Sequence, residues 1–131
     1  MSSPEVYLAV RELLTAALPD IPIVWPNEGD VTDTSMPWVY CEVVGSVLRR
    51  IELGIGFAEE RGTVWCHVYV PLGTGTLEAR TIAKRLSTAF RQARDSPVTY
   101  GDQSIGAGEP GDDDGMLWRL SLTTDYQFQD R

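Results

Sequence analysis

The first stretch that could do chemistry is the glycine-rich turn in V-Y-V-P-L-G-T-G-T-L-E-A-R, at Gly73 and Gly75. An apolar run precedes it and a helical pattern follows, and strand, glycine-rich turn and helix is the order found in phosphate-binding loops. A phosphate loop of the ATPase kind needs a lysine directly after its last glycine, but here Thr76 follows Gly75. Glu78 also puts a negative charge in the first turn of the helix, where it repels phosphate. We therefore interpret the stretch as a structural turn and expect no nucleotide or other cofactor.

The second candidate is His67, the only histidine of the chain, which falls in the middle of an alternating strand pattern. Nucleophilic catalysis needs a serine or cysteine beside such a base. Its neighbour Cys66 points to the opposite face of a strand, and no Gly-x-Ser-x-Gly motif is present. We expect no catalytic residue and no enzymatic activity.

The third candidate is the acidic stretch E-P-G-D-D-D-G, whose carboxylates could chelate calcium. They lack the alternating ligand spacing of a calcium loop, which favours a solvated acidic loop. No CxxC motif or Cys/His cluster suggests zinc, so no metal is expected. Cys41 and Cys66 lie in apolar runs and are interpreted as buried free thiols, although a disulfide is conceivable if the runs pair.

Composition restricts the function further. The chain has 131 residues, enough for one domain over 1–131, and a formal net charge of -8. This charge argues against gripping a nucleic acid backbone, which needs basic surface. No signal sequence and no membrane-spanning run of roughly 18 residues is visible, so we expect synthesis in a cytoplasm and no membrane contact.

Two amphipathic helices are the clearest elements. Ser2 or Ser3 can cap the first helix, which ends before Pro19, and Thr74 or Thr76 can cap the second, which ends near Asp95. Strands are predicted around I-P-I-V-W, from W-V-Y-C-E-V-V, over T-V-W-C-H-V-Y-V, at V-T-Y and over the alternating final segment from Trp118. Large residues on both faces of T-V-W-C-H-V-Y-V suggest a strand covered on both sides. The order predicts an α+β fold, with a mostly antiparallel sheet of four to five strands and two helices packed on one face.

Two segments are predicted to be loops. Residues 49–62 contain glycines, charges and a few apolar side chains, and they read as a long, mobile hairpin connection. Residues 101–115 read as a glycine and acid loop.

Several phrases, in order, resemble the tail terminator family of long-tailed bacteriophages and gene transfer agents. They are I-P-I-V-W-P-N-E at 21–28, P-W-V-Y at 37–40, P-L-G-T-G-T before an alanine-bearing helix, and W-R-L-S-L-T-T-D-Y near the end. The resemblance implies a virion protein made in the bacterial cytoplasm and placed at the junction of tail and neck. It implies a hexameric ring that caps the tail tube, ends its polymerisation and joins it to the neck (stopper) protein, while DNA passes through the lumen without specific binding.

Three sets of residues are candidates for these contacts. A ring needs two different complementary patches on each subunit, and a basic helix face is one candidate. Charged and apolar residues of the hairpin connection are candidates for contact with the tube or neck, and acids are candidates for a DNA-repelling lumen or an end face. The ring candidates are Arg80, Lys84, Arg85, Arg91 and Arg94; the partner candidates are Arg49, Arg50, Ile51, Leu53, Ile55, Phe57, Glu59 and Glu60; the acids are Glu109, Asp112, Asp113 and Asp114, with Glu59 and Glu60 as a second acidic pair.

Other functions remain open at this stage. A neck or head-completion protein of the same assembly would also be small, acidic and ring-forming. A small cytoplasmic enzyme or ligand-binding protein and a generic dimeric interaction module are further alternatives. For the basic helix face, simple solvation is an equally good explanation.

Overall fold

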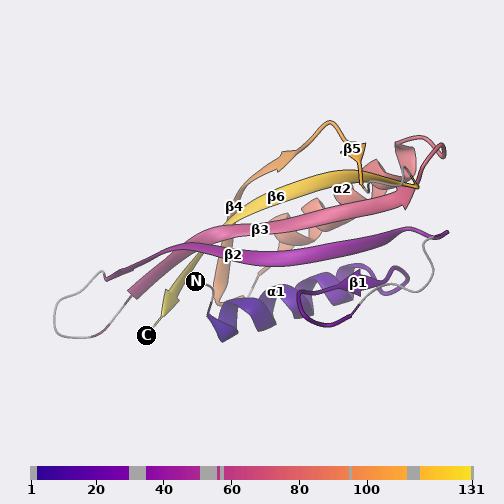
Figure 1. The fold of residues 1–131 in the computed structure, drawn as a ribbon. Coiled ribbons are helices and arrows are strands. Elements are labelled where there is room, and N and C mark those ends of the chain that lie inside the picture. The colour runs from indigo at the N-terminus through magenta and orange to yellow at the C-terminus, as the bar shows by residue number, and fades with distance from the viewer. Residues whose placement is uncertain are drawn as a thin grey trace.

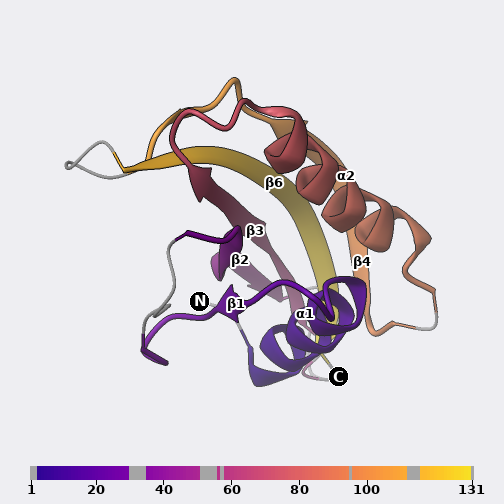
Figure 2. The ribbon, with the colours of Figure 1, turned by 90° about the vertical axis from the view of Figure 1, so that its right-hand side faces the viewer.

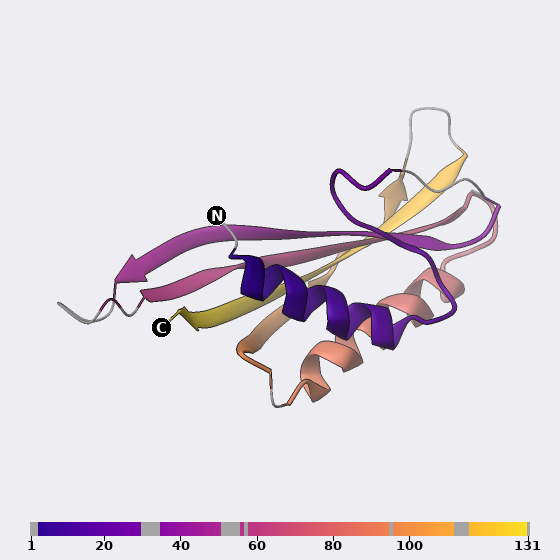
Figure 3. The same ribbon diagram turned by 90° about the horizontal axis from the view of Figure 1, so that it is seen from below.

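The structure, a computed structural model, describes residues 3–29, 35–50, 56, 58–94, 96–111 and 116–130. It consists of one twisted sheet with two helices (Figure 1). The elements in chain order are α1 Pro4–Ala17, β1 Ile23–Val24, β2 Trp38–Arg50, β3 Ala58–Pro71, α2 Leu77–Gln92, β4 Val98–Ile105, β5 Glu109–Pro110 and β6 Leu117–Asp130. Both helices lie on the same side of the sheet (Figures 2 and 3), which confirms the predicted α+β fold.

The sheet has the order β1-β2-β3-β6-β4, with β5 paired to β6. Its pairs are antiparallel except for β1, which runs parallel to β2. The described residues thus form a sheet of six strands instead of the four to five expected. The long central strands β2, β3 and β6 give the molecule its elongated shape (Figure 1).

Each helix begins and packs as its sequence pattern predicts, with one difference. Ser3 caps α1 because its Oγ accepts a hydrogen bond from the amide of Val6 at 3.4 Å. Thr76 stands at the cap position of α2, but its side chain makes no capping bond there. The turn before α2 depends instead on Gly73 and Gly75, with φ of 86° and 83°. The buried faces are Val6, Val10 and Leu14 on α1, and Ala79, Ile82, Ala83, Leu86 and Phe90 on α2.

Alternation along β3 separates the two faces of the sheet. Val64, Cys66, Val68 and Val70 are fully buried beneath the helices. Cys41 lies opposite Cys66 with its Sγ 3.5 Å away, and both are free thiols, as predicted. The hydrogen bond to Cys66 and burial both raise the pKa of the Cys41 thiol.

The other face of the sheet is not covered by the helices, which corrects the expectation of a strand covered on both sides. Aromatic rings line the middle of this open face. Trp38 stacks on Tyr69 with ring centroids 4.3 Å apart, and Trp65 stacks on His67 with ring centroids 5.7 Å apart. Trp65 keeps 38% of its surface exposed. On this face the large side chains of β3 pack against rings on the same face of the sheet and are not covered by a helix.

The prediction that residues 49–62 form a long connection is wrong for residues 49–50 and 58–62, which are strand; residues 51–55 and 57 lie outside the described residues. β2 continues to Arg50 and β3 begins at Ala58, and the two strands pair as far as Arg50 with Ala58. Arg49, Arg50 and Arg61, which indicated a loop, are tolerated in these strands because they are exposed to solvent. The predicted contact residues Ile51, Leu53, Ile55 and Phe57 lie outside the described residues.

The prediction of one loop over residues 101–115 is also wrong in part. β4 continues to Ile105 through an irregularity between Tyr100 and Gln103, and Glu109–Pro110 forms the short strand β5. Glycines here bend the strand or lie against rings: a Cβ on Gly108 would meet the Trp118 indole at 2.7 Å. Glycine is needed at position 108 because the Trp118 ring packs directly against its backbone. The sequence analysis had interpreted the glycines of this segment only as signs of a loop.

Candidate functional site

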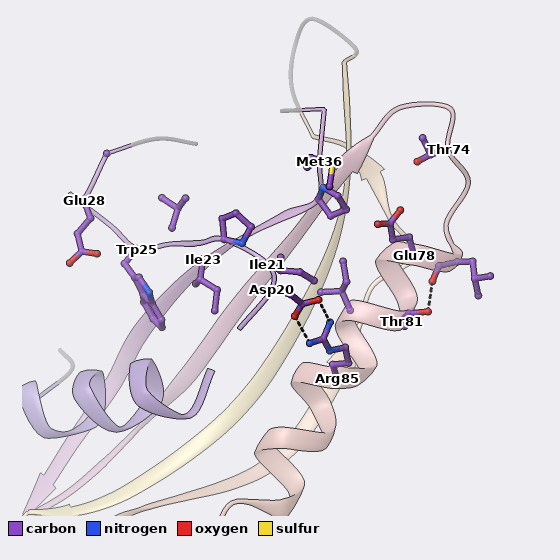
Figure 4. A pocket seen from close by; sticks show the side chains of 16 residues that line it. Asp20, Ile21, Ile23, Trp25, Glu28, Met36, Thr74, Glu78, Thr81 and Arg85 are labelled. Atoms are coloured by element: carbon purple, nitrogen blue, oxygen red, sulfur yellow. Dashed lines mark hydrogen bonds and ion pairs between the residues drawn. The ribbon is translucent and has the colours of Figure 1, made fainter. Parts of the chain in front are cut away.

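A groove lies where β1 and the segments around it face the first turns of α2 (Figure 4). Its volume is about 1070 Å³. Apolar side chains from three separate parts of the chain line it, including Ile21, Ile23, Trp25, Met36, Leu77 and Ile82. Trp25 is buried, whereas Met36 and Leu77 keep 59% and 79% of their surfaces exposed. We call this surface the groove.

An ion pair holds one wall of the groove. Arg85 on α2 donates two hydrogen bonds to the Asp20 carboxylate, at 2.7 and 3.2 Å (Figure 4). It donates a third to the carbonyl of Ala17 at 3.1 Å. These bonds lower the pKa of Asp20 and raise that of Arg85. The arginine thereby fixes the turn after α1 against α2.

The opposite end of the molecule is the projecting tip of the β2–β3 hairpin. The last residues of β2 and the first residues of β3 extend past the start of α1 (Figures 1 and 3), since Ser3, directly before α1, bonds to Glu60, which pairs with Leu48. Val44, Val47 and Leu48 are 44%, 52% and 46% exposed. Residues 49 and 50, both arginines, are exposed. On β3, Arg61 pairs with Glu59, two residues before it in the same strand. We call residues 44–50 and 58–61 the arm.

One predicted contact residue of the arm points inward. Glu60 is only 1% exposed: its carboxylate accepts a hydrogen bond from the amide of Ser3 at 3.0 Å and another from the hydroxyl of Tyr126. Burial and the bond to Glu60 raise the pKa of Tyr126. Glu60 thus forms hydrogen bonds inside the subunit. It is not part of an exposed acidic pair with Glu59.

The predicted basic face of α2 is divided in two. Arg80, Lys84, Arg91 and, just after the helix, Arg94 are exposed. The side of the helix with Arg80, Lys84 and Arg91 faces Gln103 and Ile105 of β4. Arg85 lies on the groove side, bound to Asp20, and so is separate from the other four.

The predicted acids are only partly placed. Glu109 on β5 lies opposite Arg119 of β6 and accepts a hydrogen bond from its Nε at 3.1 Å. This bond raises the pKa of Arg119. Asp112, Asp113 and Asp114 lie outside the described residues. Within the part of the chain that the structure describes, no group of three or more His, Cys, Asp or Glu residues is arranged to hold a metal ion.

Comparison with known proteins gives the family. A family model described as phage tail terminator protein matches residues 5–126.

The chain belongs to the phage tail terminator family.

Among solved structures, a chain whose name states no function superposes with a TM-score of 0.73 at 20% identity, covering 100% of this chain and 98% of that one. A chain from the virion of a native gene transfer agent particle gives a TM-score of 0.58 at 14% identity, covering 96% and 92%. At these identities the two structures show the shared fold. No curated protein matches the chain.

Membership of the terminator family makes this a structural protein of the phage tail and a component of the virion. The family implies a non-enzymatic role. In the described part of the terminator, neither helix has the length and apolar content needed to cross a bilayer.

The sequence analysis did not predict one cluster, formed by Glu42, His67 and Ser121. These residues are brought together only by the pairing of the strands. Ser121 of β6 lies directly opposite His67, and its Oγ is 2.7 Å from His67 Nδ1, although 54 residues separate them. On the other side, Glu42 Oε1 is 3.7 Å from His67 Nε2. Burial, followed by the charge of Arg119, lowers the pKa of His67.

The order acid, histidine, serine is that of a hydrolytic triad, but the surroundings differ. Such a site also needs donors aimed at an oxyanion and a cavity for the substrate. Here the side chains lie on the open face of the sheet, among the rings of Tyr40 and Trp65. Together with the non-enzymatic role of terminators, this favours a packing function for His67 and Ser121.

Proposed function

We propose that the protein forms a hexameric ring that caps the tail tube, ends its polymerisation and joins the tail to the head-neck connector. The observation that carries the proposal is the family match over residues 5–126. The partners are further copies of the chain, the tail tube protein and a neck protein. The ring acts by complementary surfaces without making or breaking a bond.

The charge of the chain fits a ring through which DNA passes. A lumen lined with carboxylates repels phosphates over a Debye length of about 8 Å at physiological salt, so DNA slides through without binding. We propose that the acids around Glu109, with Asp112, Asp113 and Asp114, lie at the lumen or an end face. The net charge of -8 supports this.

The experiment is a reconstruction of complete particles and of particles made without this protein. With the protein, one ring should occupy the layer directly on the tube; without it, tubes should be of abnormal length and unattached to heads. A ring located one layer closer to the capsid would indicate the alternative function, a neck or head-completion protein. Absence of the protein from mature particles would refute both.

The exposed basic side of α2, with Lys84 and Arg91, is a candidate contact between copies in the ring. We predict that the double substitution Lys84→Glu and Arg91→Glu weakens assembly about tenfold in low salt and has less effect at high salt, because exposed charges are screened. Light scattering or analytical ultracentrifugation at two salt concentrations measures this. Arg94→Glu alone, which reverses one charge just beyond the helix, should weaken assembly less than the double substitution. An unchanged oligomer would indicate a merely solvated helix face.

A further inference from the structure

The large exposed apolar side chains gather at the two ends of the molecule. Of the ten in the described part of the chain, three lie on the arm, namely Val44, Val47 and Leu48. Four lie at the groove end, where β2 starts and α2 begins: Met36, Leu72, Leu77 and Met116. Clusters of exposed apolar residues mark interaction sites, so both ends are candidates for the same reason.

The two ends also carry opposite charge. Around the groove, three carboxylates, Asp20, Glu28 and Glu78, stand against two guanidiniums, because Arg85 binds Asp20 and Arg11 binds Glu28; the excess is one negative charge. On the arm, three guanidiniums, Arg49, Arg50 and Arg61, stand against two carboxylates, Glu59 and the buried Glu60; the excess is one positive charge. A surface with an apolar centre and charges of one sign fits a surface with an apolar centre and charges of the other sign.

The two surfaces of one chain cannot meet each other. Pro37 lies in the groove and β2 runs from there to Arg50, a strand of 13 residues, which spans roughly 40 Å at ~3.3 Å per residue. Complementary surfaces at opposite ends of one chain are the requirement for a head-to-tail contact between copies, and such contacts close into a ring if the rotation fits.

We infer that the arm of one copy docks into the groove of the next copy. The occupant of the groove is thus a second copy of this chain, with Leu48 against the apolar wall and Arg49 beside Glu78. This inference rests on the proposed ring, and it names the subunit contact that builds it. The arm then belongs to the ring interface and is not primarily a tail tube contact.

Chemical cross-linking tests the contact. A copy with Leu48→Cys is mixed with a copy carrying Leu77→Cys and treated with a short bismaleimide, both in solution and on purified tail tubes. The native Cys41 and Cys66 are 0% exposed and stay unreactive. We expect a cross-linked dimer from the mixture and little from either variant alone, since an arm meets a groove and not another arm.

The matched control replaces the arm position with Leu8→Cys, which is 61% exposed on α1 and belongs to neither surface. This copy should yield at least tenfold less dimer with Leu77→Cys. Adding Arg49→Glu to the arm copy should lower the yield several-fold in low salt, and Glu78→Arg in the groove copy should restore it. Circular dichroism verifies that each variant is folded.

Two results would overturn the inference. One is equal cross-linking in the control pair; the other is cross-linking of Leu48→Cys to the tail tube protein without any product with Leu77→Cys. If either occurs while particle reconstructions still contain a ring on the tube, the arm and groove assignment fails and the proposed function stands. If particles contain no such ring, the proposed function itself fails.

Discussion

Replacing Glu60 by alanine should lower the free energy of unfolding by about 3–5 kcal/mol, because two hydrogen bonds to a charged group are lost; this is a large fraction of the ~5–15 kcal/mol typical of a domain. The carboxylate is buried and accepts hydrogen bonds from the Ser3 amide and the Tyr126 hydroxyl, so it ties the start of α1 to β3 and β6. Its removal leaves both donors without their partner inside the protein. Urea unfolding followed by circular dichroism measures the loss.

Two variants make this prediction specific. Tyr126→Phe keeps the ring and removes only the hydroxyl, so it should cost about 1–2 kcal/mol. Glu59→Gln, on the neighbouring position, is the matched control and should change stability by less than about 1 kcal/mol, because its partner Arg61 is exposed. A loss below about 1 kcal/mol for Glu60→Ala would contradict the structural role assigned to this carboxylate.

The helices were predictable from sequence because their signals are local. The stripe of Val6, Val10 and Leu14 and that of Ile82, Leu86 and Phe90 repeat at the helical period, and each is buried. The alternation from Leu120 to Phe128 identified β6 in the same way. Such patterns involve only residues that are close in the sequence, so they can be recognised without knowledge of the fold.

The arm and the groove were not predictable, because distant segments define them. Glu60 looks like a surface acid until Ser3 and Tyr126 are placed beside it. The groove combines the turn at Asp20 with Arg85 of α2, which sequence analysis had grouped with a basic helix face. In both cases a charged side chain was interpreted by its type, whereas its partner determines its role.

Gly62 shows the same limitation, and its substitution is the second prediction with a large effect. Gly62 pairs with Gly45 across β2 and β3 and with Tyr126 across β3 and β6. A Cβ there would lie 2.3 Å from the carbonyl oxygen of Val44 and 2.7 Å from the Tyr126 ring. Because the first of these atoms is backbone, it cannot move aside without distorting β2.

Gly62→Ala should therefore cost about 2–4 kcal/mol, measured by urea or thermal unfolding. Gly101→Ala is the matched control in a strand, since its nearest neighbouring atom would be 3.9 Å from the new Cβ; we expect a change within about 1 kcal/mol. Equal effects of the two substitutions would contradict the close packing at Gly62.

The two predictions are physically linked, and the link is itself testable. The Tyr126 ring lies against Gly62, while its hydroxyl reaches Glu60. An alanine at position 62 displaces this ring and weakens the hydrogen bond to Glu60 at the same time. The double variant Gly62→Ala and Glu60→Ala should consequently lose less than the sum of the single losses, by about 1 kcal/mol or more. Strict additivity would mean that Tyr126 keeps its hydrogen bond, and that the strain at Gly62 is confined to the backbone of β2.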